Sequence, residues 1–149
     1  MDAAVVKAGE GPELRLGDIR MVVKEDGTHT RGELGLAEFE LPPQGHDVPQ
    51  PHVHHAHEEG FYILEGELEF VVGTEAVRAG RGSFVMVPVG VPHTFSNPTE
   101  RPARFLCAFT PRRYLSYFEE VSRLLQATAS PTRQQIAELM ARYDTEVVS

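Results

Sequence analysis

Short runs of alternating apolar and polar residues dominate the chain between residues 19 and 109. Such alternation is typical of strands with one face on a core. It predicts strands at Ile19–Lys24 and Leu34–Leu41, after an irregular arm at residues 1–17. Further strands are expected at Phe61–Glu65, Glu67–Val72, Ala76–Arg78, Phe84–Val87, His93–Ser96 and Arg104–Phe109. Glycine and proline punctuate these runs at regular intervals, which is typical of an all-β sandwich or barrel.

The period changes to that of a helix after Pro111. Apolar residues from Tyr114 to Leu125 recur at three- and four-residue spacing and predict a first helix. Ser130 as N-cap and Pro131 at the first helical position predict the start of a second helix. The apolar stripe of that helix is Ile136, Leu139, Met140 and Tyr143. We expect both helices to pack on the β-structure; a pair of helices that binds a partner is the alternative.

Length and charge narrow the functional classes. A chain of 149 residues is expected to form one domain, and its 14 basic and 22 acidic residues give a net charge of −8. An acidic protein is a poor partner for nucleic acid or anionic lipid, and no apolar run is long enough to cross a membrane. The single cysteine, Cys107, excludes an internal disulfide and is expected to be a buried structural thiol. Without a recognisable signal peptide, a cytoplasmic location is expected.

Candidate chemistry is concentrated in a histidine cluster. His52 and His54 are two residues apart, so in a strand both imidazoles face the same side and can reach one metal ion. Glu59 follows a turn at residues 55–58 and offers an anionic oxygen. A His-x-His pair alone is weak evidence, but His93 would supply a third imidazole from a separate strand. His55 and His57 are out of phase with the pair and are expected to be exposed turn histidines.

Two motifs resemble those of the small single-domain metal-binding cupins. The first motif is His52-Val53-His54, then Glu59, then Gly66. The second motif is Gly82, Pro88, Gly90, His93 and Asn97. The resemblance implies a double-stranded β-helix, or jelly-roll barrel, at residues 30–111, between an arm with one strand at 1–29 and a helical segment at 112–149. It also implies one divalent metal ion held by His52, His54, Glu59 and His93. Ligation by His55 and His57 instead is the alternative, but it loses the spacing to Glu59.

The C-terminal region carries a narrower resemblance. Phe109-Thr110-Pro111, the aromatic helix and the ending from Ala141 to Val148 are similar to bacterial quercetin 2,3-dioxygenase-like cupins. Cupins of this size usually pair through an N-terminal strand, and Ile19–Lys24 has no obvious local partner. The resemblance therefore implies a homodimer.

The implied site has a definable chemistry. Three neutral imidazoles, one carboxylate and a divalent ion carry a net charge of about +1, which suits an anionic ligand that binds through two oxygens. Nitrogen and oxygen donors without sulfur fit iron, manganese, cobalt, nickel or zinc. We expect a dioxygenase acting on a small enolic or polyphenolic, flavonol-like substrate, with Glu59 as both ligand and general base.

Strand phase names four candidate pocket walls for that substrate. They are Phe61, Ile63, Phe70 and Phe95. Filling of the core is an equally good interpretation of these side chains. Two alternative functions stay open: a metal-dependent isomerase or epimerase of the same fold, and a small-ligand-binding cupin without catalysis. Oxygen dependence separates the dioxygenase from the isomerase.

Overall fold

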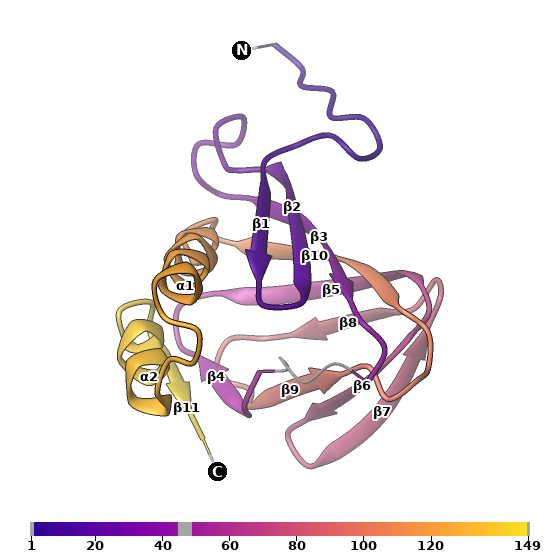
Figure 1. The fold of residues 1–149 in the computed structure, drawn as a ribbon. Coiled ribbons are helices and arrows are strands. Elements are labelled where there is room, and N and C mark those ends of the chain that lie inside the picture. The colour runs from indigo at the N-terminus through magenta and orange to yellow at the C-terminus, as the bar shows by residue number, and fades with distance from the viewer. Residues whose placement is uncertain (1, 45–48, 149) are drawn as a thin grey trace.

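The computed structural model describes residues 2–44 and 49–148, which form two antiparallel sheets and two helices (Figure 1). The six-stranded sheet runs in the order β1 (Glu13–Leu16), β2 (Ile19–Glu25), β3 (Gly35–Leu41), β10 (Ala103–Thr110), β5 (Glu58–Glu65) and β8 (Phe84–Val87). The five-stranded sheet runs in the order β11 (Thr145–Val147), β4 (His52–His54), β9 (His93–Ser96), β6 (Glu67–Val72) and β7 (Glu75–Gly80). This architecture confirms the predicted double-stranded β-helix with two C-terminal helices.

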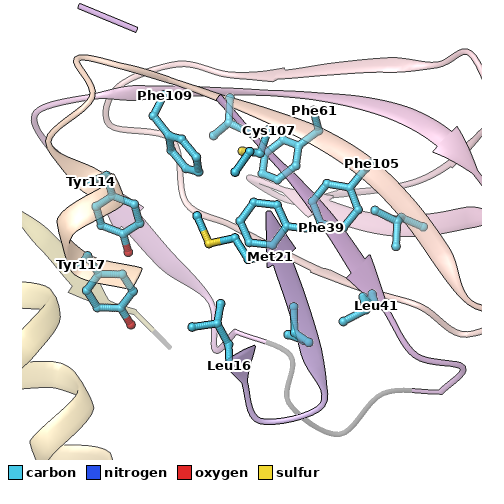
Figure 2. Packing of buried hydrophobic residues seen from close by; sticks show 14 of the residues in the cluster. Leu16, Met21, Phe39, Leu41, Phe61, Phe105, Cys107, Phe109, Tyr114 and Tyr117 are labelled. Carbon is cyan, nitrogen blue, oxygen red and sulfur yellow. The ribbon is translucent and has the colours of Figure 1, made fainter. Parts of the chain in front are cut away.

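The alternating pattern places one face of each sheet on a shared core. Along β3 and β10 every second residue is buried. Aromatic rings fill the space between the sheets, and Phe39 stacks on Phe105 with ring centroids 5.2 Å apart (Figure 2). Cys107 is buried in the same cluster, as predicted for a structural thiol, and burial raises its pKa well above the usual value.

The two helices, α1 (Tyr114–Ala127) and α2 (Arg133–Ala141), lie at one side of the barrel (Figure 1). Helix α1 buries Tyr114 and Tyr117 against the core, which confirms the expected packing. Neither helix is long and apolar enough to span a membrane.

The predicted start of α2 was wrong: its N-cap is Thr132, not Ser130. The Thr132 hydroxyl accepts from the Gln135 backbone and the Gln135 side chain accepts from the Thr132 backbone, a reciprocal pair that fixes the first turn.

Two short strands were not predicted. Strand β1 lies within the expected irregular arm and pairs with β2, which also pairs with β3. The expectation that Ile19–Lys24 lacks a local partner is therefore wrong, because this segment lies inside the sheet. Strand β11 follows Asp144, whose φ of 52° turns the chain back along β4. With three or four residues each, these strands are too short to show a clear alternation.

Candidate metal centre

Three buried imidazoles converge where β4 lies beside β9. His52 and His54 come from β4 and His93 from β9, and His52 is the register partner of His93. The ring centroids of His52 and His93 are 4.4 Å apart, and those of His54 and His93 are 5.0 Å apart. None of the three residues is more than 5% exposed. Strand phase therefore brings the predicted histidines together on the inner side of the sheet.

The second sequence motif positions His93 through its glycine. Gly90, with a φ of 83°, takes a backbone conformation that side chains disfavour. Its N–H donates to the carbonyl oxygen of His54 at 2.8 Å, which ties the turn before β9 to β4. Asn97, the last residue of the motif, donates to the carbonyl oxygen of Arg101 at 2.6 Å and closes the turn after β9. Both ends of the short strand that carries His93 are thus fixed.

Each of the three imidazoles is held by its Nδ1 atom. His52 Nδ1 lies 2.7 Å from the carbonyl oxygen of Gln50, and His93 Nδ1 lies 3.0 Å from that of Val91. A carbonyl oxygen only accepts, so Nδ1 carries the proton and a neutral ring leaves its Nε2 lone pair free. Hydrogen bonds of this kind orient metal-binding histidines in proteins.

Thr145 performs the same task for His54. The His54 Nδ1 atom lies 2.8 Å from Thr145 Oγ1, and that hydroxyl donates to the carbonyl oxygen of Tyr143 at 3.1 Å. With the hydroxyl donating to Tyr143, its oxygen is able to accept from His54 Nδ1, and a neutral His54 in that form presents a free Nε2. Thr145 lies in β11, so no local sequence pattern around His54 indicates this contact.

We expect Thr145→Val to weaken metal binding by about 10- to 100-fold, the range for loss of a group that orients a ligand. Valine keeps the shape but cannot accept the Nδ1 proton. Thr145→Ser keeps the hydroxyl and serves as the matched control, with an affinity close to wild type. Competition with a chelator measures both. Equal affinities for the valine and serine variants would refute the role of the hydroxyl.

Glu59 on β5 brings a carboxylate to the imidazoles. Its Oε1 lies 3.0 Å from His54 Nε2, and its Oε2 lies 3.5 Å from His93 Nε2. The Nε2 atoms of His54 and His93 are buried and have no hydrogen-bond partner among the described residues. Buried polar atoms without a partner cost free energy, so their convergence on an anion indicates a place for a cation. The donor set, nitrogen and oxygen without sulfur, fits a divalent metal ion.

The protonation states also suit a metal. Burial, reinforced by His93 and His54, lowers the pKa of His52 to about 4, and burial lowers the pKa of His54 as well. Burial alone would raise the pKa of Glu59, but the neighbouring imidazoles, His54 foremost, outweigh it and hold that pKa well below its usual value. At neutral pH the site therefore offers the neutral imidazoles of His52 and His54 and an ionised carboxylate, which are the metal-binding forms.

The structure corrects the prediction for one of the two additional histidines. His55 is exposed, as expected, and its Nε2 lies 3.2 Å from a carboxylate oxygen of Glu146. His57 is not exposed: it is 4% accessible, and its Nε2 lies 3.1 Å from Glu59 Oε1. The turn after β4 interrupts the alternation of inward and outward side chains. The side of the sheet on which His57 lies is therefore predicted from Glu59, two residues later, and not from His54. Counted that way, His57 shares the inner face.

The aromatic side chain that contacts this cluster most closely differs from the predicted pocket walls. The four predicted pocket residues, Phe61, Ile63, Phe70 and Phe95, all lie in or against the core. The Phe61 ring is 5.1 Å from Phe70 and 5.5 Å from Phe95, so these side chains pack on one another. Their contact with a substrate stays a prediction. Tyr114, which the sequence placed only on a packing stripe, stacks on His57 at 4.3 Å and contacts His54 at 4.7 Å.

Comparison with known sequences identifies the central segment. Residues 37–109 match the family described as the cupin domain. An uncharacterized protein of Streptomyces coelicolor is 39% identical over 57 residues, which are 38% of this chain and 53% of that protein. The match therefore spans about half the length of that curated relative.

Solved structures with the same fold differ in the activities their descriptions give. A predicted oxalate decarboxylase of Thermotoga maritima matches at 22% identity with a TM-score of 0.67, over 72% of this chain and 99% of its own. KdgF of a Halomonas species matches at 20% identity and 0.66, over 75% and 96%. A putative sugar phosphate isomerase of Acidithiobacillus ferrooxidans matches at 22% and 0.52, over 61% and 59%. At such identities the likeness shows the fold alone.

Proposed function

We propose that the cupin domain at residues 37–109 holds one divalent metal ion through His52, His54, Glu59 and His93, and that it is a dioxygenase of small enolic or polyphenolic compounds. The observation that carries the metal proposal is the convergence of unpartnered imidazole Nε2 atoms on a buried, ionised Glu59. Three neutral imidazoles and one carboxylate leave a divalent ion with a net charge of about +1 and with open positions. Such a centre favours an anionic substrate that binds through two neighbouring oxygens.

The residues of the chain have separable roles in this proposal. A redox-active ion held by these residues would supply the electron transfer needed for O₂ to react with an organic anion. Glu59 accepts the hydroxyl proton of the substrate and so generates that anion. The imidazoles, each oriented by a bond at Nδ1, hold the ion in place. Phe61, Phe70 and Phe95 would exclude water and pack against a flat ring, since the three rings already contact one another.

An isomerase is the second candidate, because a putative sugar phosphate isomerase is among the proteins with this fold. It needs the same metal but no oxygen. Residues 30–111 contain no lysine, which disfavours a phosphorylated substrate. A small-ligand-binding cupin without turnover is the third candidate.

One experiment separates these candidates. Elemental analysis of protein purified without chelator identifies the metal, and O₂ consumption is then followed with a panel of flavonols, catechols and enols. We expect near-stoichiometric metal and oxygen uptake with at least one compound. Turnover that persists under strict anaerobiosis would support the isomerase and refute the dioxygenase. A folded protein without affinity for any divalent ion would refute the metal centre.

We also propose that two copies associate through the outer face of β5 and β8. Tyr62, Phe84 and Met86 are 44%, 60% and 45% exposed there, and β8 is an edge strand of its sheet. The Phe84 ring lies over Gly60, where a Cβ atom would come within 2.9 Å of it. Exposed aromatic residues beside an unpaired edge favour association. A small-molecule substrate, rather than nucleic acid or membrane, and a cytoplasmic location stay predictions.

Light scattering is expected to give a dimer mass at micromolar concentration, and Phe84→Glu is expected to give a monomer because it places a charge in the apolar contact. Val77→Glu, a similarly exposed valine on β7 of the other sheet, is the control and should leave the dimer intact. A monomeric wild type would reject the proposal.

A further inference from the structure

His57 differs from the other buried histidines in the atom that holds it. His52, His54 and His93 are each bonded at Nδ1, and the Nε2 atoms of His54 and His93 have no hydrogen-bond partner within residues 2–44 and 49–148. His57 is instead bonded through Nε2, which lies 3.1 Å from Glu59 Oε1. A carboxylate accepts only, so His57 Nε2–H is the donor. His57 thus bonds through the ring atom that His54 and His93 leave without a partner in the part of the chain that the structure describes.

The surroundings of His57 fix that donor in place. Its ring stacks on Tyr114, with ring centroids 4.3 Å apart and planes 28° from parallel. The ring of His54 lies 4.0 Å away on the same cluster. The imidazole is only 4% exposed, so its hydrogen bond is shielded from water. A buried hydrogen bond between an imidazole and an ionised carboxylate is among the strong ones, so Glu59 is held by it.

We infer that His57 is a positioning residue for the metal centre, and that it determines which oxygen of Glu59 the metal receives. The inference rests on the proposed metal site. Oε1 lies 3.0 Å from His54 Nε2, but it also accepts the hydrogen bond of His57, which occupies one of its lone pairs. Oε2 lies 3.5 Å from His93 Nε2 and takes no part in the bond to His57, so we assign it to the ion. Glu59 then contributes one ligand atom rather than two.

The number of ligand atoms decides what else the metal can bind. With three imidazoles and one carboxylate oxygen, a six-coordinate ion keeps two open positions, whereas a carboxylate that binds through both oxygens would leave one. His57 therefore reserves room for a ligand with two oxygen atoms, such as an enolate with an adjacent carbonyl group or a catecholate. The substrate class suggested above needs such room.

Two substitutions at His57 separate the hydrogen bond from packing. His57→Phe keeps a ring against Tyr114 but has no donor, whereas His57→Gln places an amide N–H near the position of Nε2. His55→Phe, in the same turn but exposed, is the matched control. Each protein is loaded with Co²⁺, and the affinity is measured by chelator competition. The visible absorption of the bound ion reports its coordination number.

We expect His57→Phe to bind Co²⁺ about 10- to 100-fold more weakly than wild type, the range for groups that support a ligand. Its spectrum should shift, and the two-oxygen anion oxalate should lose more affinity for the bound ion than azide does. His57→Gln and His55→Phe should behave as wild type. Thermal unfolding of each variant verifies that it is folded.

The experiment distinguishes a failure of the role of His57 from a failure of the metal centre. An unchanged affinity and spectrum in folded His57→Phe would overturn the role of His57 while leaving the metal centre intact. Equal losses in His57→Phe and His57→Gln would overturn it too, because they would make His57 a ligand itself or a packing residue. A wild type that does not bind Co²⁺ would instead refute the proposed metal centre on which the inference rests.

Discussion

Replacing His93 by alanine is expected to remove most of the bound metal and to lower metal affinity by more than about 100-fold. Loss of a group that merely supports a ligand costs up to about that factor, and loss of a ligand costs more. His93 is the imidazole that comes from β9, whereas His52 and His54 come from β4. Without it, the remaining histidines reach the ion from one strand only.

Elemental analysis and chelator competition measure this loss. His55→Ala is the matched control. It also removes an imidazole from the histidine-rich segment, but the His55 side chain is 53% exposed. We expect it to keep the metal content of wild type. Stoichiometric metal in folded His93→Ala would show that the ion is held elsewhere. That result would remove the basis of the proposed function.

The second large effect is expected for Glu59→Gln. The amide keeps the volume and one oxygen but removes the negative charge and the base. Turnover of a substrate that wild type consumes should therefore fall by about 10²- to 10⁴-fold, the range for general acid–base catalysis. Metal content should fall less than in His93→Ala, because the three imidazoles remain. Oxygen uptake under saturating substrate measures the rate.

A neighbouring carboxylate provides the control. Glu58 precedes Glu59 on β5 and accepts a hydrogen bond from Thr110 Oγ1 at 2.7 Å, which a glutamine oxygen can also accept. Glu58→Gln should therefore leave turnover unchanged. Full activity in Glu59→Gln would show that the carboxylate is neither base nor a needed charge.

The strands and the histidine pair could be predicted from the sequence because each strand buries one of its two faces. Strands such as Glu67–Val72 and His93–Ser96 have the predicted bounds, because a core on one face imposes alternation and glycine or proline ends each run. The same phase argument placed His52 and His54 on one face, whereas the motif assigned Glu59 to the site after the turn at residues 55–58. The convergence of His93 on them needed a motif as well, since a separate strand supplies it.

Contacts between distant segments explain what could not be predicted. Strand β11 has three residues and pairs with β4 some 90 positions earlier, so its own sequence shows no strand pattern. Thr145 acts on His54 through that pairing. The orientation of His57 depends on the path of the turn before β5, which alternation does not describe. In the sequence, Tyr114 is only one apolar residue of a helical stripe, although its ring packs on His54 and His57.

The pairing of β4 with β11 means that the segment matched to the cupin family cannot be excised intact. Strand β4 has one register partner in β9 but three in β11. A fragment cut at residues 37–109 would lose β11 and with it the Thr145 hydroxyl, leaving the ligand strand at an open edge. We expect removal of residues 145–147 to weaken metal binding although it removes none of the proposed ligands, because β11 supports β4 and Thr145 orients His54.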